Sequence, residues 1–478
     1  MGKKYIIGID VGSQSSKVMI YDLDGNLVCE AKEPLQPMHL AEDTVVEHPG
    51  DDLWDSLCVA AKKLMTDFTG DPQDILGIGL GAIRCCRVLL KKDGTLAAPA
   101  ISWMDKRVSV PYQHTNPEVA YVTTTDGYLT HRLTGEFRDN IGNYYGQWPV
   151  DYDAWDWSTD PEVLKQYNIP RDMLFDVGVP GAALGTVTRE ASEATGFPEG
   201  LPVLSTTSDK AVEGLGAGLV RAGTAVVSLG TYITCMVIKD EMPPADAQAY
   251  WGIMSSIPHR YIYESYGIRR GMWTVSWFRD LLGEEVGARA REAGISAEEY
   301  LDRRSAEIPA GSDGLMTKLD WLANPWEPFK RGVMIGFNAD HDFRYMYRSI
   351  LEGIAYTMKN NVDALMAERG EELGELIIVG GGSNGDLFMQ IFADVFDVPV
   401  KRNVVASSAG LGAAINAAVG LGAYHSYEEA VAKMVKVKDT FVPIAANAER
   451  YRKLNAVYKT ISTYTDEVLK ATYEALKA

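Results

Sequence analysis

Two short segments that lie far apart in the chain share one pattern, and this pattern restricts the fold more than any other feature. In the first segment, the apolar stretches Tyr5–Asp10 and Lys17–Asp22 flank the turn-rich stretch Val11–Ser16. In the second, residues 225–228 and 232–237 flank Leu229–Thr231 in the same way. Each segment predicts two strands joined by a tip that combines glycine with hydroxyl side chains. The repeat predicts an internally duplicated fold with one such hairpin in each half.

Strand and helix patterns alternate through the rest of the chain, which predicts an α/β fold. Apolar runs predict buried strands at residues 75–80, 201–205 and 376–379. Apolar residues at helical spacing predict helices at 51–68, 209–219, 345–358, 361–369, 386–396 and 408–422. Residues 102–160 predict loops and short helices that are exposed or line a cleft. The expected division is an N-terminal domain (1–220), a C-terminal domain (221–445) and a long amphipathic helix (446–478) packed at the domain interface.

The charge and cysteine content argue against several classes of function. The 478 residues carry 46 Lys and Arg against 65 Asp and Glu, and this net charge of −19 disfavours nucleic-acid and membrane-surface partners. The sequence lacks a secretory signal and any apolar run of the ~20 residues that a transmembrane helix needs. The five cysteines form no CxxC pair, so neither a zinc site nor a disulfide framework is indicated. These features predict a soluble cytoplasmic protein.

The two hairpin tips are candidate phosphate-binding loops, because backbone N–H groups in a Gly/Ser turn converge on an anion. The candidates in the first tip are Gly12, Ser13, Gln14, Ser15 and Lys17. Asp10, at the end of the preceding strand, is placed to hold a cation through water. In the second tip, Gly230 and Thr231 would face the same phosphates. Either tip taken alone is also compatible with an ordinary hairpin turn.

A run of three glycines at a predicted strand–helix junction is a further candidate site. Gly380, Gly381 and Gly382 are followed by Ser383 and Asn384. Adjacent glycines let a flat ligand lie against the backbone, and the N-terminus of the following helix favours an anion or a polar ring edge. The spacing does not match the GxGxxG dinucleotide motif. Ligand contact is favoured over a simple tight turn, because one glycine usually suffices for a turn.

Two residues are candidates for contact with the polar oxygens of a substrate. Asp209 stands between a predicted strand and a predicted helix, where a carboxylate can accept a proton from an alcohol or can cap the helix, and the residues alone favour the cap. Arg84 follows a buried strand and is a candidate for binding substrate oxygens. The neighbouring Cys85 and Cys86 lack spaced metal-binding partners, so we expect packing residues there rather than a metal or redox pair.

Taken in order, these segments resemble the FGGY carbohydrate kinases, the group of glycerol kinase, xylulokinase and ribulokinase. Besides the hairpin tips, Asp209 and the triple glycine, the resemblance rests on Trp103-Met104-Asp105-Lys106-Arg107, Leu133-Thr134-Gly135, and Arg348 with Leu351-Glu352-Gly353. It implies two actin-like (ribonuclease H-like) domains with a cleft between them. The N-terminal domain would bind the sugar and carry the catalytic base, and the C-terminal domain would bind ATP.

The resemblance also implies roles for single residues. Asp209 would be the general base, and Mg²⁺ would be contacted by Asp10 and Asp209. Arg84, Trp103 and Asp105 would bind the sugar, although Asp105 is also suited to a structural salt bridge. The hairpin tips and the triple glycine would hold ATP.

Three departures from the family pattern lie on the acceptor side. Ile83-Arg84-Cys85-Cys86 stands where xylulokinases carry Q-M-H-G, residues 107–126 form a shortened segment, and a G-E-R near Trp321–Pro328 is absent. The expected function is therefore ATP-dependent phosphorylation of a terminal hydroxyl of a small ketose or polyol, foremost of the pentulose type. Glycerol, a tetritol or a sugar acid are alternative acceptors. An actin- or heat-shock-like ATP-binding switch is the alternative of another class. The sequence is compatible with a homodimer but leaves the oligomeric state open.

Overall fold

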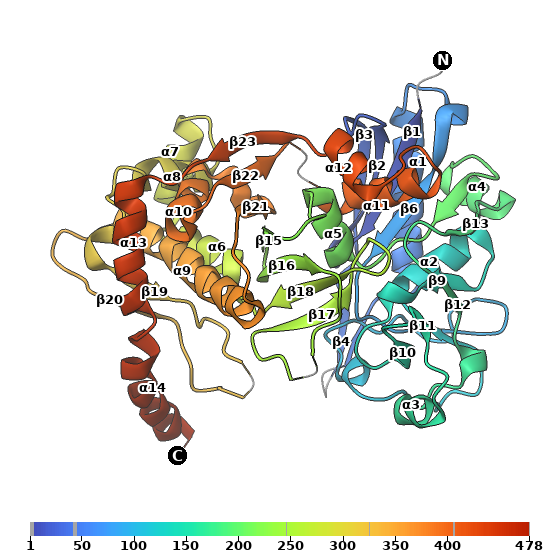
Figure 1. Ribbon diagram of the computed structural model, residues 1–478, viewed down its shortest axis with the longest axis horizontal. Helices are drawn as coiled ribbons and strands as arrows, with labels where there is room; N and C mark the ends of the chain where they lie inside the picture. The colour runs from blue at the N-terminus through green and yellow to red at the C-terminus, as the bar shows by residue number, and fades with distance from the viewer. Residues whose placement is uncertain (1–3, 42–44, 245, 325, 405–406, 478) are drawn as a thin grey trace.

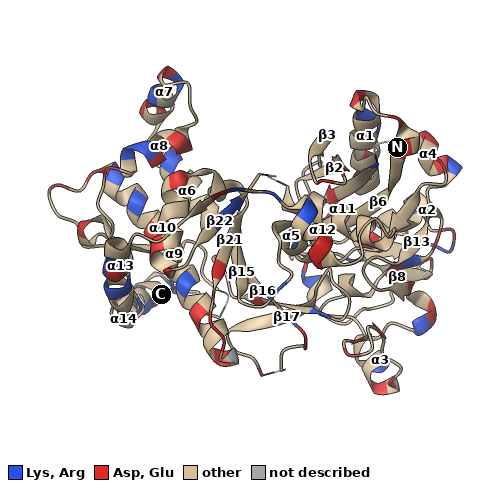
Figure 2. Cartoon of the chain, turned by 45° about the horizontal axis from the view of Figure 1, so that its top comes forward, with Lys and Arg blue, Asp and Glu red and all other residues tan. Residues whose placement is uncertain are grey.

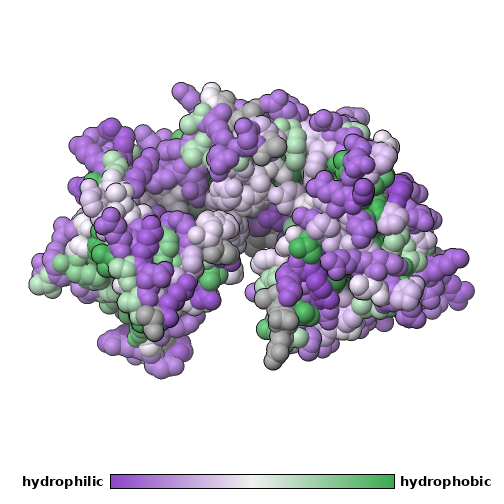
Figure 3. All heavy atoms as spheres, turned by 90° about the horizontal axis from the view of Figure 1, so that it is seen from below, coloured by the Kyte–Doolittle hydropathy of each residue, from purple (hydrophilic) through white to green (hydrophobic). Residues whose placement is uncertain are grey.

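The computed structural model describes residues 4–41, 45–244, 246–324, 326–404 and 407–477. The chain forms two α/β lobes, each built on one large sheet (Figure 1). Seen from below, a hollow separates the lobes (Figure 3). Acidic and basic side chains are interspersed over both lobes (Figure 2). Within the described parts of the chain, the helices are all too short or too polar to cross a membrane.

The N-terminal sheet has six strands in the order β13-β14-β6-β1-β2-β3. The strands are β1 (Tyr5–Val11), β2 (Ser15–Asp22), β3 (Leu27–Pro34), β6 (Ile75–Ala82), β13 (Ala183–Thr186) and β14 (Pro202–Leu204). The hairpin β1–β2 is antiparallel and pairs Asp10 with Lys17, whereas β1, β6 and β14 run parallel. Helix α1 (Asp52–Asp67) packs on β2 and β3.

The C-terminal sheet repeats this plan in the order β17-β18-β16-β15-β21-β22-β23. The strands are β15 (Thr224–Leu229), β16 (Ile233–Lys239), β17 (Tyr250–Met254), β18 (Tyr261–Ser265), β21 (Glu375–Val379), β22 (Val400–Asn403) and β23 (Val437–Phe441). Here β15–β16 is the antiparallel hairpin, and β15, β21 and β22 run parallel. The matching strand order confirms the internal duplication that the two hairpins predicted.

Two helices of small residues, α5 (Asp209–Ala217) and α11 (Ser408–Gly420), pack against each other and against the N-terminal sheet. Glycine makes this close approach possible: a Cβ at Gly412 would lie 1.9 Å from the Val212 carbonyl oxygen, and one at Gly8 would lie 2.0 Å from that of Gly410. Helix α12 (Tyr427–Met434) follows on the same side (Figure 1). Helix α11, which follows β22 in the chain, therefore packs on the sheet of the N-terminal lobe. The expected domain boundary at residue 220 assigns this helix to the C-terminal domain, although it contacts the N-terminal sheet.

The end of the chain differs from the expectation. The predicted helix from residue 446 onward is two helices, α13 (Ala445–Tyr458) and α14 (Ile461–Lys477). Helix α13 packs on α10 (Asp386–Phe396), and the Tyr451 hydroxyl donates to the Glu352 carboxylate at 2.7 Å. Both helices lie on the side of the C-terminal lobe that is remote from the N-terminal lobe (Figure 1). Placing this segment at the domain interface was wrong, because the aromatic residues of α13 find their apolar partners within the C-terminal lobe.

Two further segments differ in detail from their predicted form. The helices expected at 345–358 and 361–369 are one helix, α9 (Phe343–Arg369). Residues 102–160 contain the expected loops and a short helix, α2 (Thr125–Thr134), but also the short strands β8 (Tyr121–Thr123), β9 (Arg138–Asn140), β10 (Val150–Asp151) and β11 (Asp156–Trp157). The Trp155 indole of this segment donates to the Tyr261 hydroxyl on β18 at 2.9 Å. The segment thus joins the two lobes at one side of the cleft.

Candidate active site

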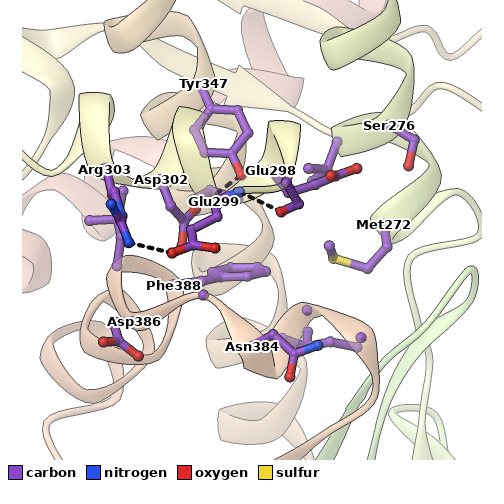
Figure 4. Close-up of a pocket in the computed structure, with 18 of the residues that line it drawn as sticks. Met272, Ser276, Glu298, Glu299, Asp302, Arg303, Tyr347, Asn384, Asp386 and Phe388 are labelled. Carbon is purple, nitrogen blue, oxygen red and sulfur yellow. Dashed lines mark hydrogen bonds and ion pairs between the residues drawn. The ribbon is translucent and has the colours of Figure 1, made fainter. Parts of the chain in front are cut away.

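A cavity of about 700 Å³ opens in the C-terminal lobe between the second hairpin tip and the triple glycine. Of the sequence candidates, its lining includes Gly230, Thr231, Gly381, Gly382 and Asn384. The opposite wall comes from α8 (Ala297–Ser305) and the start of α10, with Phe388 and Asp302 facing the cavity (Figure 4). The fold thus brings the second hairpin tip and the triple-glycine loop, which are distant in the sequence, together at one cavity.

The first two glycines of the run have different surroundings. Gly380 has a φ of +86°, and a Cβ there would lie 2.6 Å from the Leu229 carbonyl oxygen, so this glycine serves the fold. A Cβ at Gly381 would meet nothing within 4 Å, although the residue lines the cavity. Ser383 donates its hydroxyl to the Gly380 carbonyl at 2.8 Å and, with Gly380, lines a smaller neighbouring hollow. The exposed backbone of Gly381 is therefore the part of the loop that is open to a ligand.

The first hairpin tip lies at the ends of β1 and β2 in the N-terminal sheet. The Gly12 amide donates to the Ser15 carbonyl at 3.1 Å, which closes the turn, and leaves Ser13 and Gln14 exposed at its tip. Ser15 is buried. The Lys17 ammonium lies 3.0 Å from the Asp10 carboxylate, so this cation and this anion are held together beside the turn.

Asp209 is the first residue of α5, and the N-cap position belongs to Ser208. Asp209 is therefore one position beyond the cap that the residues alone favoured, although its carboxylate accepts a hydrogen bond from the Lys210 amide of the first turn at 2.9 Å. Burial raises the pKa of the Asp209 carboxyl, the cations Arg84 and Lys210 act to lower it, and the charge of Asp10 raises it. The pKa of Asp209 is thus influenced by charged groups on β1, on the loop after β6 and on α5 itself.

Arg84 makes a contact that the sequence did not reveal. Its guanidinium forms a bidentate ion pair with Glu264 of β18, at 2.7 Å and 3.0 Å, and the Glu264 side chain is fully buried. Burial opposes the charge on Arg84, but the Glu264 carboxylate raises the Arg84 pKa above its ordinary value. A carboxylate in the middle of the otherwise apolar or neutral stretch Tyr261–Ser265 was the available signal, because a charge in a buried strand needs a partner.

Lys210 was also missed as a member of the site. Its ammonium lies 2.7 Å from the Glu213 carboxylate and 3.1 Å from the Ser228 hydroxyl at the end of β15. Lys210 therefore links α5, which follows the N-terminal sheet, to the hairpin of the C-terminal sheet. A lysine one position beyond the candidate base was visible in the sequence, but nothing in the pattern showed that it points into the interior.

Trp103 and Asp105 have different surroundings. Trp103 is 50% exposed, which leaves its indole ring free to contact a ligand. Asp105 is buried and accepts hydrogen bonds from the Val46 amide and from the Arg107 guanidinium, both at 2.7 Å. The Asp105 carboxylate is thus occupied by contacts within the N-terminal lobe and is suited to positioning Trp103 rather than to direct contact with a ligand.

The vicinal cysteines lie beside this site. Cys86 is buried, and burial raises the pKa of its thiol. Cys85 has a φ of +63°, an uncommon conformation for a residue other than glycine, and burial also raises the pKa of its thiol. Both thiols are free. Among the described residues, His, Cys, Asp and Glu form no group of three or more that could ligate a metal.

The two predicted metal contacts fit a magnesium ion that is shared with phosphate. Mg²⁺ in phosphoryl-transfer sites is bound through one or two carboxylates plus substrate phosphates rather than by an all-protein cage. Asp10 and Asp209 are two carboxylates close enough to influence each other electrostatically. Their number and type therefore suit the group.

Comparison with known proteins agrees with this geometry. Over 477 residues, covering 100% of this chain and 97% of the other, the sequence is 59% identical to the uncharacterised sugar kinase YgcE of Escherichia coli strain K12. The structure resembles xylulose kinase from Rhodospirillum rubrum (TM-score 0.84, 23% identity, 98% and 100% coverage). It also resembles Plasmodium falciparum glycerol kinase with ADP (TM-score 0.79, 18% identity, 96% and 98% coverage).

Two family models cover most of the chain. Residues 5–117 and 111–216 match the N-terminal domain of the FGGY family of carbohydrate kinases, and residues 225–421 match its C-terminal domain. The two-domain actin-like architecture predicted from the motifs is confirmed by the solved structures that share this fold. The chain is a carbohydrate kinase and belongs to the FGGY family.

Proposed function

We propose that this kinase transfers the γ-phosphoryl group of ATP to a terminal hydroxyl of a small ketose or polyol, foremost a pentulose, with Asp209 as the general base. The observation that carries the proposal is the position of Asp209. It is a half-buried carboxylate at the start of α5 whose pKa is influenced by Asp10, Arg84 and Lys210, and the neighbouring Lys210 ammonium reaches the Ser228 hydroxyl at the end of β15. General bases of this kind are carboxylates within reach of the acceptor hydroxyl.

The nucleotide assignment is supported by the cavity in the C-terminal lobe. Its lining of Gly230, Thr231 and the open backbone of Gly381 suits a flat base and its phosphates. A glycerol kinase of the same fold was solved with ADP. Gly12, Ser13, Gln14, Ser15 and Lys17 would contact the phosphates from the N-terminal side, and Gly380, Ser383 and Asn384 would complete the nucleotide loop.

In the proposed reaction, Asp209 accepts the proton of the acceptor hydroxyl as its oxygen bonds to the γ-phosphorus, and the bond from that phosphorus to the bridging oxygen of ADP breaks. Lys17 and the amides of the two hairpin tips neutralise charge on the transferred group. Mg²⁺, held by Asp10 and Asp209, would supply further charge neutralisation between the phosphates. Arg84 and Trp103 orient the acceptor, with Asp105 holding the Trp103 segment in place.

Other acceptors remain alternatives that the same chemistry would serve: glycerol, a tetritol or a sugar acid. An ATP-driven switch of the actin type would need no base and no acceptor. An acceptor screen that follows ADP release separates these cases, because a kinase consumes ATP in proportion to phosphorylated acceptor whereas a switch turns over without one.

The decisive test of the base is Asp209→Asn, which keeps the shape of the side chain. We expect kcat to fall on the order of 10²–10⁴-fold, a larger loss than any change in the ATP Kd measured by calorimetry, to which the loss of one of the two proposed Mg²⁺ contacts would contribute. Ser208→Ala, at the true N-cap, controls for the start of α5. A folded Asp209→Asn variant with wild-type turnover on the acceptor would refute the assignment.

A further inference from the structure

An ion pair joins the two lobes, because its two members come from different sheets. Arg84 lies on the loop after β6 of the N-terminal sheet, and Glu264 lies on β18 of the C-terminal sheet. Both guanidinium NH₂ groups contact the carboxylate, and the Trp251 indole donates to it at 3.1 Å. We propose that Glu264 determines whether the site selects a neutral or an acidic acceptor. By neutralising Arg84, it makes the site select an uncharged polyol or ketose over a sugar acid. This inference rests on the proposed function, because it concerns the acceptor of the same reaction.

The donor geometry of Arg84 supports this selection. A guanidinium binds a carboxylate best through two parallel N–H groups. Glu264 already occupies such a pair, since its two oxygens accept from Nη1 and Nη2. The donors that remain on Arg84, which include Nε–H, can still bind hydroxyl groups. An acidic acceptor at these donors would place a second carboxylate on a guanidinium whose charge the fully buried Glu264 carboxylate already balances, so it would gain little from the cation, and displacing Glu264 would leave a buried charge without its partner.

The charge balance of the neighbouring groups supports the same conclusion. The cations around the candidate base each have an acidic partner, in the pairs Lys17–Asp10, Lys210–Glu213 and Arg84–Glu264. Asp209 adds a further carboxylate, so the acidic groups of this set outnumber the basic ones. An anionic acceptor would bring one more negative charge into a site of low dielectric, where like charges repel strongly. A neutral acceptor carries no such penalty.

The test compares matched neutral and acidic acceptors. The pairs are glycerol with glycerate, erythritol with erythronate, xylulose with xylonate, and glucitol with gluconate. Calorimetry measures the binding of each compound, and a coupled assay of ADP release measures turnover. For wild type, we expect at least one neutral compound to bind and to be phosphorylated with a higher kcat/KM than its acid.

Glu264→Gln removes the charge of Glu264 and keeps its size. We expect this variant to shift the ratio of acid to neutral affinity toward the acid on the order of 10- to 100-fold, the difference between a charge-assisted and a neutral hydrogen bond. Arg84→Gln should shift the ratio in the opposite direction, which provides a second readout if Glu264→Gln folds poorly. Glu193→Gln, which removes an exposed partner of Arg189, is the matched control for a change of net charge.

The outcomes separate this inference from the proposed function. An unchanged acid-to-neutral ratio in a folded Glu264→Gln variant overturns the role of Glu264, even if wild type phosphorylates a neutral sugar. A wild-type preference for the acids overturns it as well. If neutral compounds bind and Glu264→Gln shifts the affinities as expected, but no ADP is released with any acceptor, the role of Glu264 stands and the proposed reaction fails. If wild type binds none of the neutral compounds, the inference is overturned directly.

Discussion

Replacing Gly381 by valine tests whether the triple-glycine loop is a wall of the nucleotide site. A Cβ at Gly381 would meet no protein atom within 4 Å, and its φ lies outside the left-handed region. The substitution should therefore change the free energy of unfolding by no more than about 0.5 kcal/mol, as is usual for substitutions without steric conflict. The added carbons would instead enter the cavity that Gly230 and Asn384 also line.

The expected effect on ATP binding follows because the added side chain would point into the cavity. Forcing extra carbon atoms into a filled site costs about 1–3 kcal/mol. At 1.4 kcal/mol for each factor of ten, the ATP Kd should rise roughly 5- to 150-fold. Acceptor binding should stay unchanged, because the acceptor candidates Arg84 and Trp103 belong to the other lobe. Calorimetric titrations with ATP and with the acceptor, and urea unfolding of the same samples, measure the three quantities separately.

Gly380→Ala is the matched comparison in the same loop. This position has a φ of +86°, and its Cβ would lie 2.6 Å from the Leu229 carbonyl oxygen. With a ψ of 174°, this backbone conformation is essentially restricted to glycine and costs about 1–3 kcal/mol for another residue, and the steric conflict adds about 1–3 kcal/mol. Gly380→Ala should therefore destabilise the fold. An unchanged ATP Kd in a folded Gly381→Val variant, or an equal loss of ATP and acceptor binding, would refute the reasoning.

Two further predictions concern groups beside the site. Activity should survive a strong reductant, and a chelator once Mg²⁺ is restored, because we expect the half-buried Cys85 and the buried Cys86 to be packing residues rather than redox or metal groups; zinc retained in stoichiometric amount would contradict this. Burial, together with the charge of Asp139, raises the pKa of Asp126, so the folded state holds a proton that the unfolded chain releases, and stability is lost as the pH rises through the folded-state value. In urea unfolding, Asp126→Asn should therefore gain stability relative to wild type as the pH rises above about 4, the ordinary pKa of aspartate, whereas a difference that is independent of pH would argue against the raised pKa.

Local sequence patterns determined the elements and the candidate nucleotide loops. A hairpin, a short buried strand or a glycine-rich turn depends on the properties of neighbouring residues, so the pattern around Gly12, Gly230 and Gly380 was sufficient to find the loops. The repeated hairpin also predicted the duplicated sheet order. The ends of helices were less well predicted: the expected break within α9 and the continuous C-terminal helix were both wrong, because packing rather than local preference decides where a long helix continues.

Tertiary structure alone decided which residues share a site. Arg84 and Glu264 are 180 positions apart, and no local pattern links a loop after one sheet to the middle of a strand in the other. The same holds for Lys210, whose ammonium reaches Ser228 on the second hairpin, and for Asp105, whose carboxylate is used within its own lobe. Periodicity predicts which side of an element is buried, but the partner of a buried charge depends on how the two lobes pack together. The acceptor side of this kinase is built from such pairs, which is why its sequence predicted the chemistry of phosphoryl transfer better than the identity of the acceptor.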